Sequence, residues 1–245
     1  MEVDLVCGKP CTKFIIMIKN KKLVIIGLGE TADIAYEYFT EDSAYEVVAF
    51  SVNKEYLKQD KYLGLPVVAF EELEKYYDPK KYEVYVAISY VKLNRTRRKM
   101  FEASKNKGFH CASYISSKAF VWRNVKIGEN VFIFENNVIQ HKVIIGNNVI
   151  LWSGNHIGHR TEIGDNVYLS SHCVISGFCK IGNNSFLGVN CTFNDNISIA
   201  KDTVIGSGAL VVKNQIVPGC LLVGSPASVA KKSAYEVFKV DVNNI

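Results

Sequence analysis

The stretch "VIIGNNVILWSGNHIGHRTEIGDNVYL", residues 143–169, carries an aliphatic residue at every sixth position. Counting in steps of six from Ile115 to Val223, without a change of register, gives nineteen positions. Eighteen of them are Ile, Leu or Val, and Phe193 is the exception. Amphipathic helices and strands have apolar periods of about 3.6 and 2, so neither explains a period of six.

The remaining positions of each six predict a β-helix built from short strands and tight corners. Gly often follows the aliphatic residue, as in Gly128, Gly146, Gly158, Gly164, Gly182, Gly188 and Gly206. Small or β-branched residues often lie four positions after it, and Asn and Asp, which tolerate positive φ, fill the turns. Three sixes form a triangular coil of 18 residues, and such coils are stable only when stacked. The inward Cys173, Cys179 and Cys191 are then small hydrophobic residues.

The region before the repeat has the pattern of a small α/β unit. We expect a strand, a Gly-rich turn and an amphipathic helix over residues 22–39, and a second strand over 45–50. A helix over 70–82, a third strand over 83–89 and a basic helix over 92–108 complete it. This order predicts a Rossmann-type domain at about residues 22–110.

Composition excludes several classes of protein. The net charge of +5 is spread along 245 residues, which suits anionic small molecules but not nucleic acid. The chain has no apolar run long enough to span a membrane, and its first 21 residues are expected to be an extension rather than a signal sequence. The seven scattered cysteines favour a reducing, cytoplasmic compartment.

The hexapeptide repeat resembles the left-handed β-helix of hexapeptide acyltransferases over about residues 111–228, leaving 229–245 as a C-terminal tail. The handedness is implied by this resemblance alone. A Rossmann-like domain followed by such a helix resembles the bacterial nucleotide-aminosugar N-acetyltransferases and their relatives named for sialic acid O-acetylation. The segment "LLVGSPASVAKK", residues 221–232, resembles the closing G-x-P-A segment of that group, which lies near coenzyme A.

The resemblance also implies a site for the sugar nucleotide. Gly27, Leu28, Gly29 and Glu30 fall where the nucleotide-linked sugar lies, and Asn53 with Lys54 falls where its base is read. The same Gly-rich turn taken alone suits a phosphate at a helix start, or only a tight turn with packing glycines. A dinucleotide is disfavoured, because Ser51 and Asn53 stand where an acidic residue would bind the ribose.

An 18-residue coil predicts that His141, His159, Gly177 and Asp195 share one corner of successive coils, about 5 Å apart. The resemblance of "HIGHRTEIG" to the stretch holding the family's catalytic His implies that His159 is the general base. It implies further that the Gly177 amide donates to the acetyl carbonyl. Arg160 stands where the family often has an acidic residue, so the partner that orients His159 stays open.

The other histidines favour plainer interpretations. His141 and His172 are expected to be solvated turn residues, and His156 is expected to point outward from a flat side. For His172, contact with the pantetheine or acetyl group is the alternative. Without three or four converging ligands, no metal site is expected.

The resemblance places four residues near coenzyme A, namely Val189, Ser207, Gly224 and Pro226. We therefore expect an acetyl-CoA-dependent N-acetyltransferase that acts directly on the amine of a nucleotide-linked deoxyaminosugar in surface-glycan synthesis. The family forms trimers, and outward aromatic residues such as Trp152 and Tyr168 are expected to pack between neighbouring helices. The alternatives are an O-acetyltransferase with the same machinery and a non-catalytic scaffold or sugar-nucleotide sensor.

Overall fold

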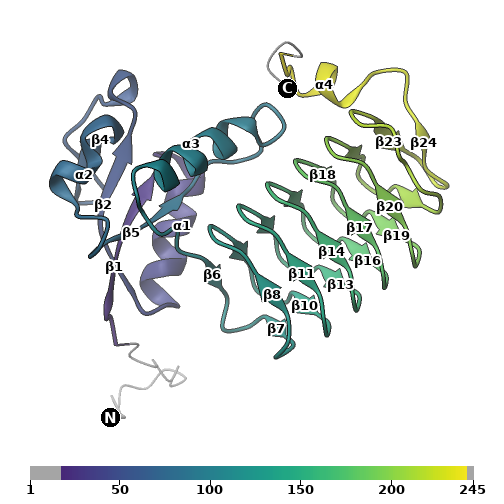
Figure 1. The fold of residues 1–245 in the computed structure, drawn as a ribbon, viewed down its shortest axis with the longest axis horizontal. Helices are drawn as coiled ribbons and strands as arrows, with labels where there is room; N and C mark the ends of the chain where they lie inside the picture. The colour runs from purple at the N-terminus through teal and green to yellow at the C-terminus, as the bar shows by residue number, and fades with distance from the viewer. Residues whose placement is uncertain (1–17, 242–245) are drawn as a thin grey trace, which may run out of the picture.

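The computed structural model describes residues 18–241, which form an α/β domain followed by a triangular prism of stacked coils (Figure 1). The fold class predicted from the sequence is therefore confirmed. Most of the expected N-terminal extension lies outside the described residues.

The α/β domain is built on a sheet with the strand order β3-β4-β2-β1-β5. Its strands are β1 (Lys21–Ile26), β2 (Tyr45–Val52), β3 (Lys61–Tyr62), β4 (Leu65–Ala69) and β5 (Glu83–Val86). Its helices are α1 (Glu30–Glu41), α2 (Leu73–Tyr76) and α3 (Arg95–Asn106), with short 3-10 turns at Lys54–Tyr56 and Phe70–Glu72. Strand β1 pairs in parallel with β2 on one side and β5 on the other, so the chain reverses its direction across the sheet at β1.

Two expectations for this domain need correction. The sequence pattern did not indicate β4, which pairs in parallel with β2, because Pro66 interrupts an otherwise apolar run. The helix expected over residues 70–82 is reduced to a 3-10 turn and one turn of α-helix, which ends before Asp78 and Pro79.

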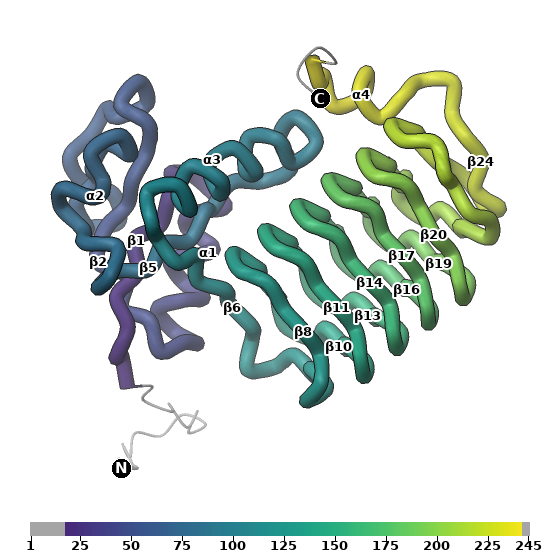
Figure 2. The backbone as a smooth tube through the Cα atoms, viewed as in Figure 1, coloured from purple at the N-terminus to yellow at the C-terminus, as the bar shows by residue number. Residues whose placement is uncertain are grey.

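The prism has three faces, each a sheet with one parallel strand per coil, and β24 (Ser228–Val229) is added in antiparallel to the end of one of them (Figure 2). The first, here called the covered face, contains β6 (Tyr114–Ile115), β9 (Phe132–Ile133), β12 (Ile150–Leu151), β15 (Tyr168–Leu169), β18 (Phe186–Leu187), β21 (Val204–Ile205), β23 (Leu221–Val223) and β24 (Ser228–Val229). The apolar face contains β7 (Phe120–Val121), β10 (Val138–Ile139), β13 (His156–Ile157), β16 (Val174–Ile175), β19 (Thr192–Phe193) and β22 (Leu210–Val211). The charged face contains β8 (Lys126–Ile127), β11 (Ile144–Ile145), β14 (Glu162–Ile163), β17 (Lys180–Ile181) and β20 (Ser198–Ile199).

The six-residue repeat sets both the core and the corners. Every sixth residue from Ile133 to Val211 is buried in one continuous core together with the small residues four positions after it. Every sixth residue from Asn130 to Gly208 has a positive φ, which explains the Asn, Asp and Gly at most of these corners. Burial raises the pKa of the Cys179 thiol, as expected for a packing residue.

The register does not continue unchanged to the end of the repeat. Ile205 pairs with Leu222, so the last coil is one residue shorter than the 18-residue coils before it, which pair Ile157 with Ile175 and likewise throughout. The predicted inward residues Val217 and Val223 are instead 58% and 39% exposed. The expectation of an unbroken register is therefore wrong after Val211, where the loop before β23 leaves the prism.

The α/β domain lies on the covered face, so this face is not free for a neighbouring helix. Helix α1 packs Ala35 and Phe39 into a cluster with Phe132 and Tyr168 of the prism. The expectation that Trp152 and Tyr168 pack between neighbouring prisms is therefore wrong. Sequence alternation shows that these side chains point outward, but it does not show that the chain's own domain covers them.

Helix α3 fixes the α/β domain along the edge between the charged and covered faces. We call this the asparagine edge, because Asn130, Asn148, Asn166, Asn184 and Asp202 follow one another there at 18-residue spacing. The first three side chains form a ladder, in which Asn130 Nδ2 donates to Asn148 Oδ1 and Asn148 Nδ2 donates to Asn166 Oδ1, both at 2.8 Å.

Two arginines of α3 bind the asparagine edge. Arg97 is fully buried and donates from Nε and Nη2 to the Oδ1 and main-chain oxygen of Asn148, both at 3.1 Å. Arg95 forms an ion pair of 3.0 Å with the buried Asp202. Burial lowers the pKa of Arg97 to about 10, which leaves it charged at neutral pH. The hydrogen bonds to the corner oxygens offset part of the cost of burying that charge.

Replacement of Arg97 tests this docking. Arg97→Ala is expected to lower the free energy of unfolding by about 3 kcal/mol, because it leaves buried carbonyl and amide oxygens without a donor. Urea or thermal unfolding at a fixed protein concentration measures the change. Arg98→Ala is the control, since Arg98 forms only a surface pair with Glu102, and is expected to cost about 0.5 kcal/mol or less. Equal losses in the two variants would contradict the assignment.

Candidate functional site

The edge between the apolar and charged faces, here called the histidine edge, brings together the predicted column of four residues. The rings of His141 and His159 are stacked, with centroids 5.6 Å apart and planes within 12°. In the next coil, the Gly177 amide donates to Asp195 Oδ1 at 2.8 Å. The 18-residue spacing therefore predicted these neighbours correctly.

His159 is held by contacts from both sides. Its backbone N–H donates to Gln140 Oε1 at 2.9 Å, and its Nδ1 lies 3.2 Å from the same oxygen. The ring of Phe178 lies edge-on to the imidazole at 5.1 Å, and the Arg160 guanidinium lies 5.8 Å from the centroid of that ring. Glu162, the acidic residue nearest to His159 in the sequence, is exposed on the charged face. The partner of His159 that the sequence left open is thus Gln140.

Gly177 provides the space that the imidazole of His159 occupies. A Cβ at this position would lie 2.6 Å from Cε1 and 2.8 Å from Nε2 of His159, well inside van der Waals contact. Gly177 does not have a positive φ. Its lack of a side chain therefore serves close approach rather than an unusual backbone conformation.

The Gly177 amide is engaged by Asp195 in this structure. Side chains accept amides in the same way elsewhere in the prism, for example where Asp165 accepts from Asn147. Asp195 is exposed, so its carboxylate can rotate away from the edge. The amide can serve an acyl oxygen only after that rotation, because a carboxylate beside a developing oxyanion would repel it.

The remaining histidines do not join this group. His156 lies on the apolar face in β13, and His172 is exposed at a corner with positive φ. Within residues 18–241, no three His, Cys, Asp or Glu side chains are arranged to hold a metal ion.

The residues expected to contact coenzyme A lie on a different edge, between the covered and apolar faces. Val189 and Ser207 are exposed at equivalent corners of successive coils, and the Gly208 amide donates to the Val189 carbonyl at 2.8 Å. Gly224 follows them in the shortened last coil, and its carbonyl accepts from the Leu210 amide at 3.0 Å. Pro226 is exposed in the turn before β24. We call this the valine edge.

The residues expected to bind the sugar nucleotide gather at the carboxyl ends of β1 and β2. Gly27, with φ of 128°, and Gly29, with φ of 98°, form the turn into α1, and a Cβ on Gly27 would lie 2.7 Å from the Ala87 carbonyl oxygen. Asn53 follows β2 directly, and the Lys54 amide donates to Glu71 at 2.9 Å. These four residues, with Leu28 and Glu30, therefore occupy the end of the sheet at which open α/β sheets bind ligands.

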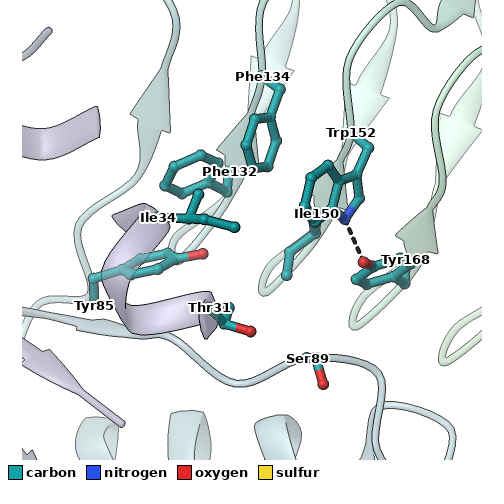
Figure 3. Close-up of a pocket in the computed structure, with 9 residues that line it drawn as sticks. All are labelled: Thr31, Ile34, Tyr85, Ser89, Phe132, Phe134, Ile150, Trp152 and Tyr168. Atoms are coloured by element: carbon teal, nitrogen blue, oxygen red, sulfur yellow. Dashed lines mark hydrogen bonds between the residues drawn. The ribbon is translucent and has the colours of Figure 1, made fainter. Parts of the chain in front are cut away.

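The structure adds residues to this region that the sequence analysis missed. A small apolar pocket lies between Thr31 of α1, Ser89 of the loop after β5, and Trp152 and Tyr168 of the covered face (Figure 3). The Trp152 indole donates to the Tyr168 hydroxyl, and burial raises the pKa of Tyr168 to about 12. Because β1 lies between β2 and β5, the loop after β5 borders the same crevice as the Gly27–Gly29 turn.

The sequence-predicted site is therefore split over the prism. The sugar-nucleotide residues lie over the covered face, while His159 and Gly177 lie on the histidine edge, which is the edge opposite that face. The predicted coenzyme A residues lie on the valine edge.

Comparison with known proteins identifies relatives with this combination of domains. Residues 110–217 match a family model described as the C-terminal domain of GMPPB, and no curated protein matches the chain. A variant of perosamine N-acetyltransferase from Caulobacter crescentus, in complex with CoA and GDP-perosamine, is 26% identical, with a TM-score of 0.76 over 86% of this chain and 97% of that one. The acetyltransferase domain of PglB from Neisseria gonorrhoeae is 25% identical, with a TM-score of 0.76 over 86% of this chain and 100% of that one.

These relatives confirm the resemblance inferred from the sequence. The similarity extends over both domains. The α/β domain and the stacked parallel strands of this chain are consistent with the left-handed β-helix of such acetyltransferases. Nothing in residues 18–241 is helical, long and apolar enough to cross a membrane.

Adding a methyl group at Gly177 tests the contact with His159. Gly177→Ala is expected to leave the fold intact, displace the imidazole and destabilise the protein by about 1 kcal/mol, because the methyl group overpacks the edge. Unfolding measurements give the energy, and a crystal structure gives the position of the ring.

The matched control is the same change in a His159→Ala background. Without the imidazole the new methyl group has room, so the cost of Gly177→Ala is expected to fall close to zero. A cost that is unchanged by removing His159 would show that the methyl group meets some other obstacle.

Proposed function

We propose that this chain, which shares its fold and domain order with the hexapeptide-repeat sugar N-acetyltransferases, transfers the acetyl group of acetyl-CoA to the amine of a nucleotide-linked aminosugar. The observation that carries the proposal is the histidine edge, where an oriented imidazole lies directly against Gly177, whose amide donates to the exposed Asp195. The likeness to perosamine N-acetyltransferase, in complex with CoA and GDP-perosamine, supports both the acyl donor and the class of acceptor.

The reaction is a direct transfer. The amine attacks the thioester carbonyl and forms the new C–N bond, while His159 accepts the N–H proton. The Gly177 amide, once released by Asp195, stabilises the oxyanion. Collapse of the intermediate breaks the C–S bond, and the CoA sulfur leaves as a thiolate that takes up a proton. Among residues 18–241, no hydrogen bond joins His159 to a Ser or Cys side chain, which favours transfer without an acyl-enzyme.

The split of the site supports assembly into a homotrimer. Within one chain, the sugar-nucleotide residues and His159 lie on opposite sides of the prism, so one protomer's base would act on the sugar held by its neighbour. Coenzyme A would likewise lie between Gly177 of one prism and Val189, Ser207 and Gly224 of another. Exposed apolar side chains on the apolar face, such as Val138 and Val174, suit contact with a second copy.

The cellular setting follows from the cysteines and the substrates. The buried thiols of Cys173, Cys179 and Cys191 are unpaired, which suits a reducing compartment such as the cytoplasm. The product would be an N-acetylated nucleotide sugar for surface-glycan synthesis.

The test is release of the CoA thiol from acetyl-CoA in the presence of 3-amino and 4-amino sugars on UDP, dTDP and GDP, with matched hydroxy sugars. Turnover is expected on an amino sugar, and His159→Ala is expected to reduce kcat by about 100-fold or more. His141→Ala is the control and is expected to keep kcat within about threefold, since His141 only stacks on the base.

Two outcomes would contradict this proposal. Turnover on hydroxy sugars alone would support O-acetylation by the same edge. Full activity of a folded His159→Ala protein would exclude His159 as the base.

Mixed oligomers test whether the site lies between protomers. Asn53→Ala/Lys54→Ala and His159→Ala chains are each expected to be inactive when expressed alone. Random 1:1 co-assembly is expected to recover about a quarter of wild-type activity, because a quarter of the heterologous interfaces combine an intact half from each chain. An inactive mixture, with mixed trimers verified by two affinity tags, would place the whole site within one chain.

A further inference from the structure

Gln140 contacts His159 through an atom whose identity the geometry fixes. It follows β10, one coil before His159, and accepts the His159 backbone N–H. A backbone N–H can only donate, so the side-chain atom that faces it is the carbonyl oxygen rather than the amide nitrogen. The same oxygen lies 3.2 Å from Nδ1 of the imidazole. In the neutral ring, Nδ1 must therefore carry the proton, and Nε2 keeps its lone pair.

The free nitrogen lies beside Gly177, the residue proposed to hold the acyl oxygen. Cε1 and Nε2 lie over Gly177, in space that no side chain of that residue fills. The charged and titratable groups around the ring are His141, stacked below it, Arg160, beyond the Phe178 ring, and Asp195, on the far side of Gly177. The partner of Nδ1 is thus the neutral side-chain amide of Gln140, and the nearby Arg160 carries a positive charge.

Gln140 differs from the other side chains that accept amides at the corners. Asn124, Asn147 and Asn183 each accept a backbone N–H across a sequence separation of 18 residues. Gln140 reaches His159 across 19 residues and contacts both its backbone and its ring. The extra methylene of Gln permits the second contact, which a corner-stabilising role alone does not require.

We infer that Gln140 is a positioning residue that sets the Nδ1–H tautomer of His159 and presents Nε2 as the base. Because Gln140 is uncharged, it orients the ring without the additional stabilisation that a carboxylate would give the imidazolium. That suits an amine acceptor, which attacks with its own lone pair and loses a proton that becomes acidic as the C–N bond forms. A hydroxyl acceptor would need the proton removed more fully during attack. This inference rests on the proposed role of His159 as the base.

The test compares three variants of the full-length protein. Gln140→Met keeps the length of the side chain but removes the acceptor, and is expected to lower kcat by about 10- to 100-fold with KM for acetyl-CoA within about threefold. Gln140→Glu keeps the acceptor and is expected to restore most of kcat, with the acidic limb of the kcat profile moved to higher pH. Asn124→Ala removes a corner acceptor that touches only a backbone amide, and is expected to leave kcat and its pH profile unchanged.

Nitrogen NMR of histidine-labelled protein reads the tautomer directly, with His159→Ala providing the assignment. The wild-type protein is expected to have protonated Nδ1 and unprotonated Nε2 above the titration of the ring. Gln140→Met is expected to shift the ring towards the Nε2–H form. The wild-type spectrum needs no variant of Gln140, so the test stands even if Gln140→Met fails to fold.

Each outcome separates this inference from the proposed function. An Nε2–H ring in the wild-type protein, or wild-type kcat in folded Gln140→Met while His159→Ala is inactive, would overturn the role of Gln140 alone. An active His159→Ala protein would instead overturn the proposed base.

Discussion

The structure depends on one constraint, the alignment of equivalent residues at intervals of 18 along the prism. Parallel strand pairs such as Val138 with His156, and His156 with Val174, repeat this interval through successive coils. Each corner maintains this interval by placing one residue, usually Asn, in the left-handed region of backbone conformation. The chain thereby passes from one face of the prism to the next every six residues. Residues far apart in the sequence thus become vertical neighbours, and every functional column inherits this geometry.

The same constraint determines which part of the prism is free for chemistry. The asparagine edge presents a ladder of side-chain amides and carbonyls that holds Arg97 and Arg95, and through them the α/β domain. Once that domain covers one face, the histidine edge is the edge furthest from it. The position of the buried guanidinium and the exposure of His159 are therefore two consequences of a single docking geometry.

Much of the prism could be predicted from the sequence because its contacts join residues of the same or adjacent coils, which lie at fixed intervals in the sequence. The buried aliphatic residues, the left-handed corners and the stacking of His141 on His159 all follow from the period. What the period does not encode is how separate units meet. The placement of Trp152 and Tyr168 under α1 could not be found from alternation, nor could the loss of register before Leu222. The Asp195 carboxylate on the Gly177 amide and the Gln140 contact depend on side-chain rotamers, which a one-dimensional pattern does not specify.

The fixed coil length limits how such a protein can change in evolution. An insertion of 18 residues between the histidine edge and the C-terminus would lengthen the prism and leave every column in line. An insertion of six residues between His159 and Gly177 would preserve the hexapeptide pattern, yet it would carry Gly177 to another edge and separate it from the imidazole. The shortened coil that ends in β23 and the antiparallel β24 then close the stack, so that the last coil offers no matching surface for further growth by the same repeat. Insertions that preserve the aligned columns of this fold therefore come in multiples of the 18-residue coil rather than of the six-residue repeat.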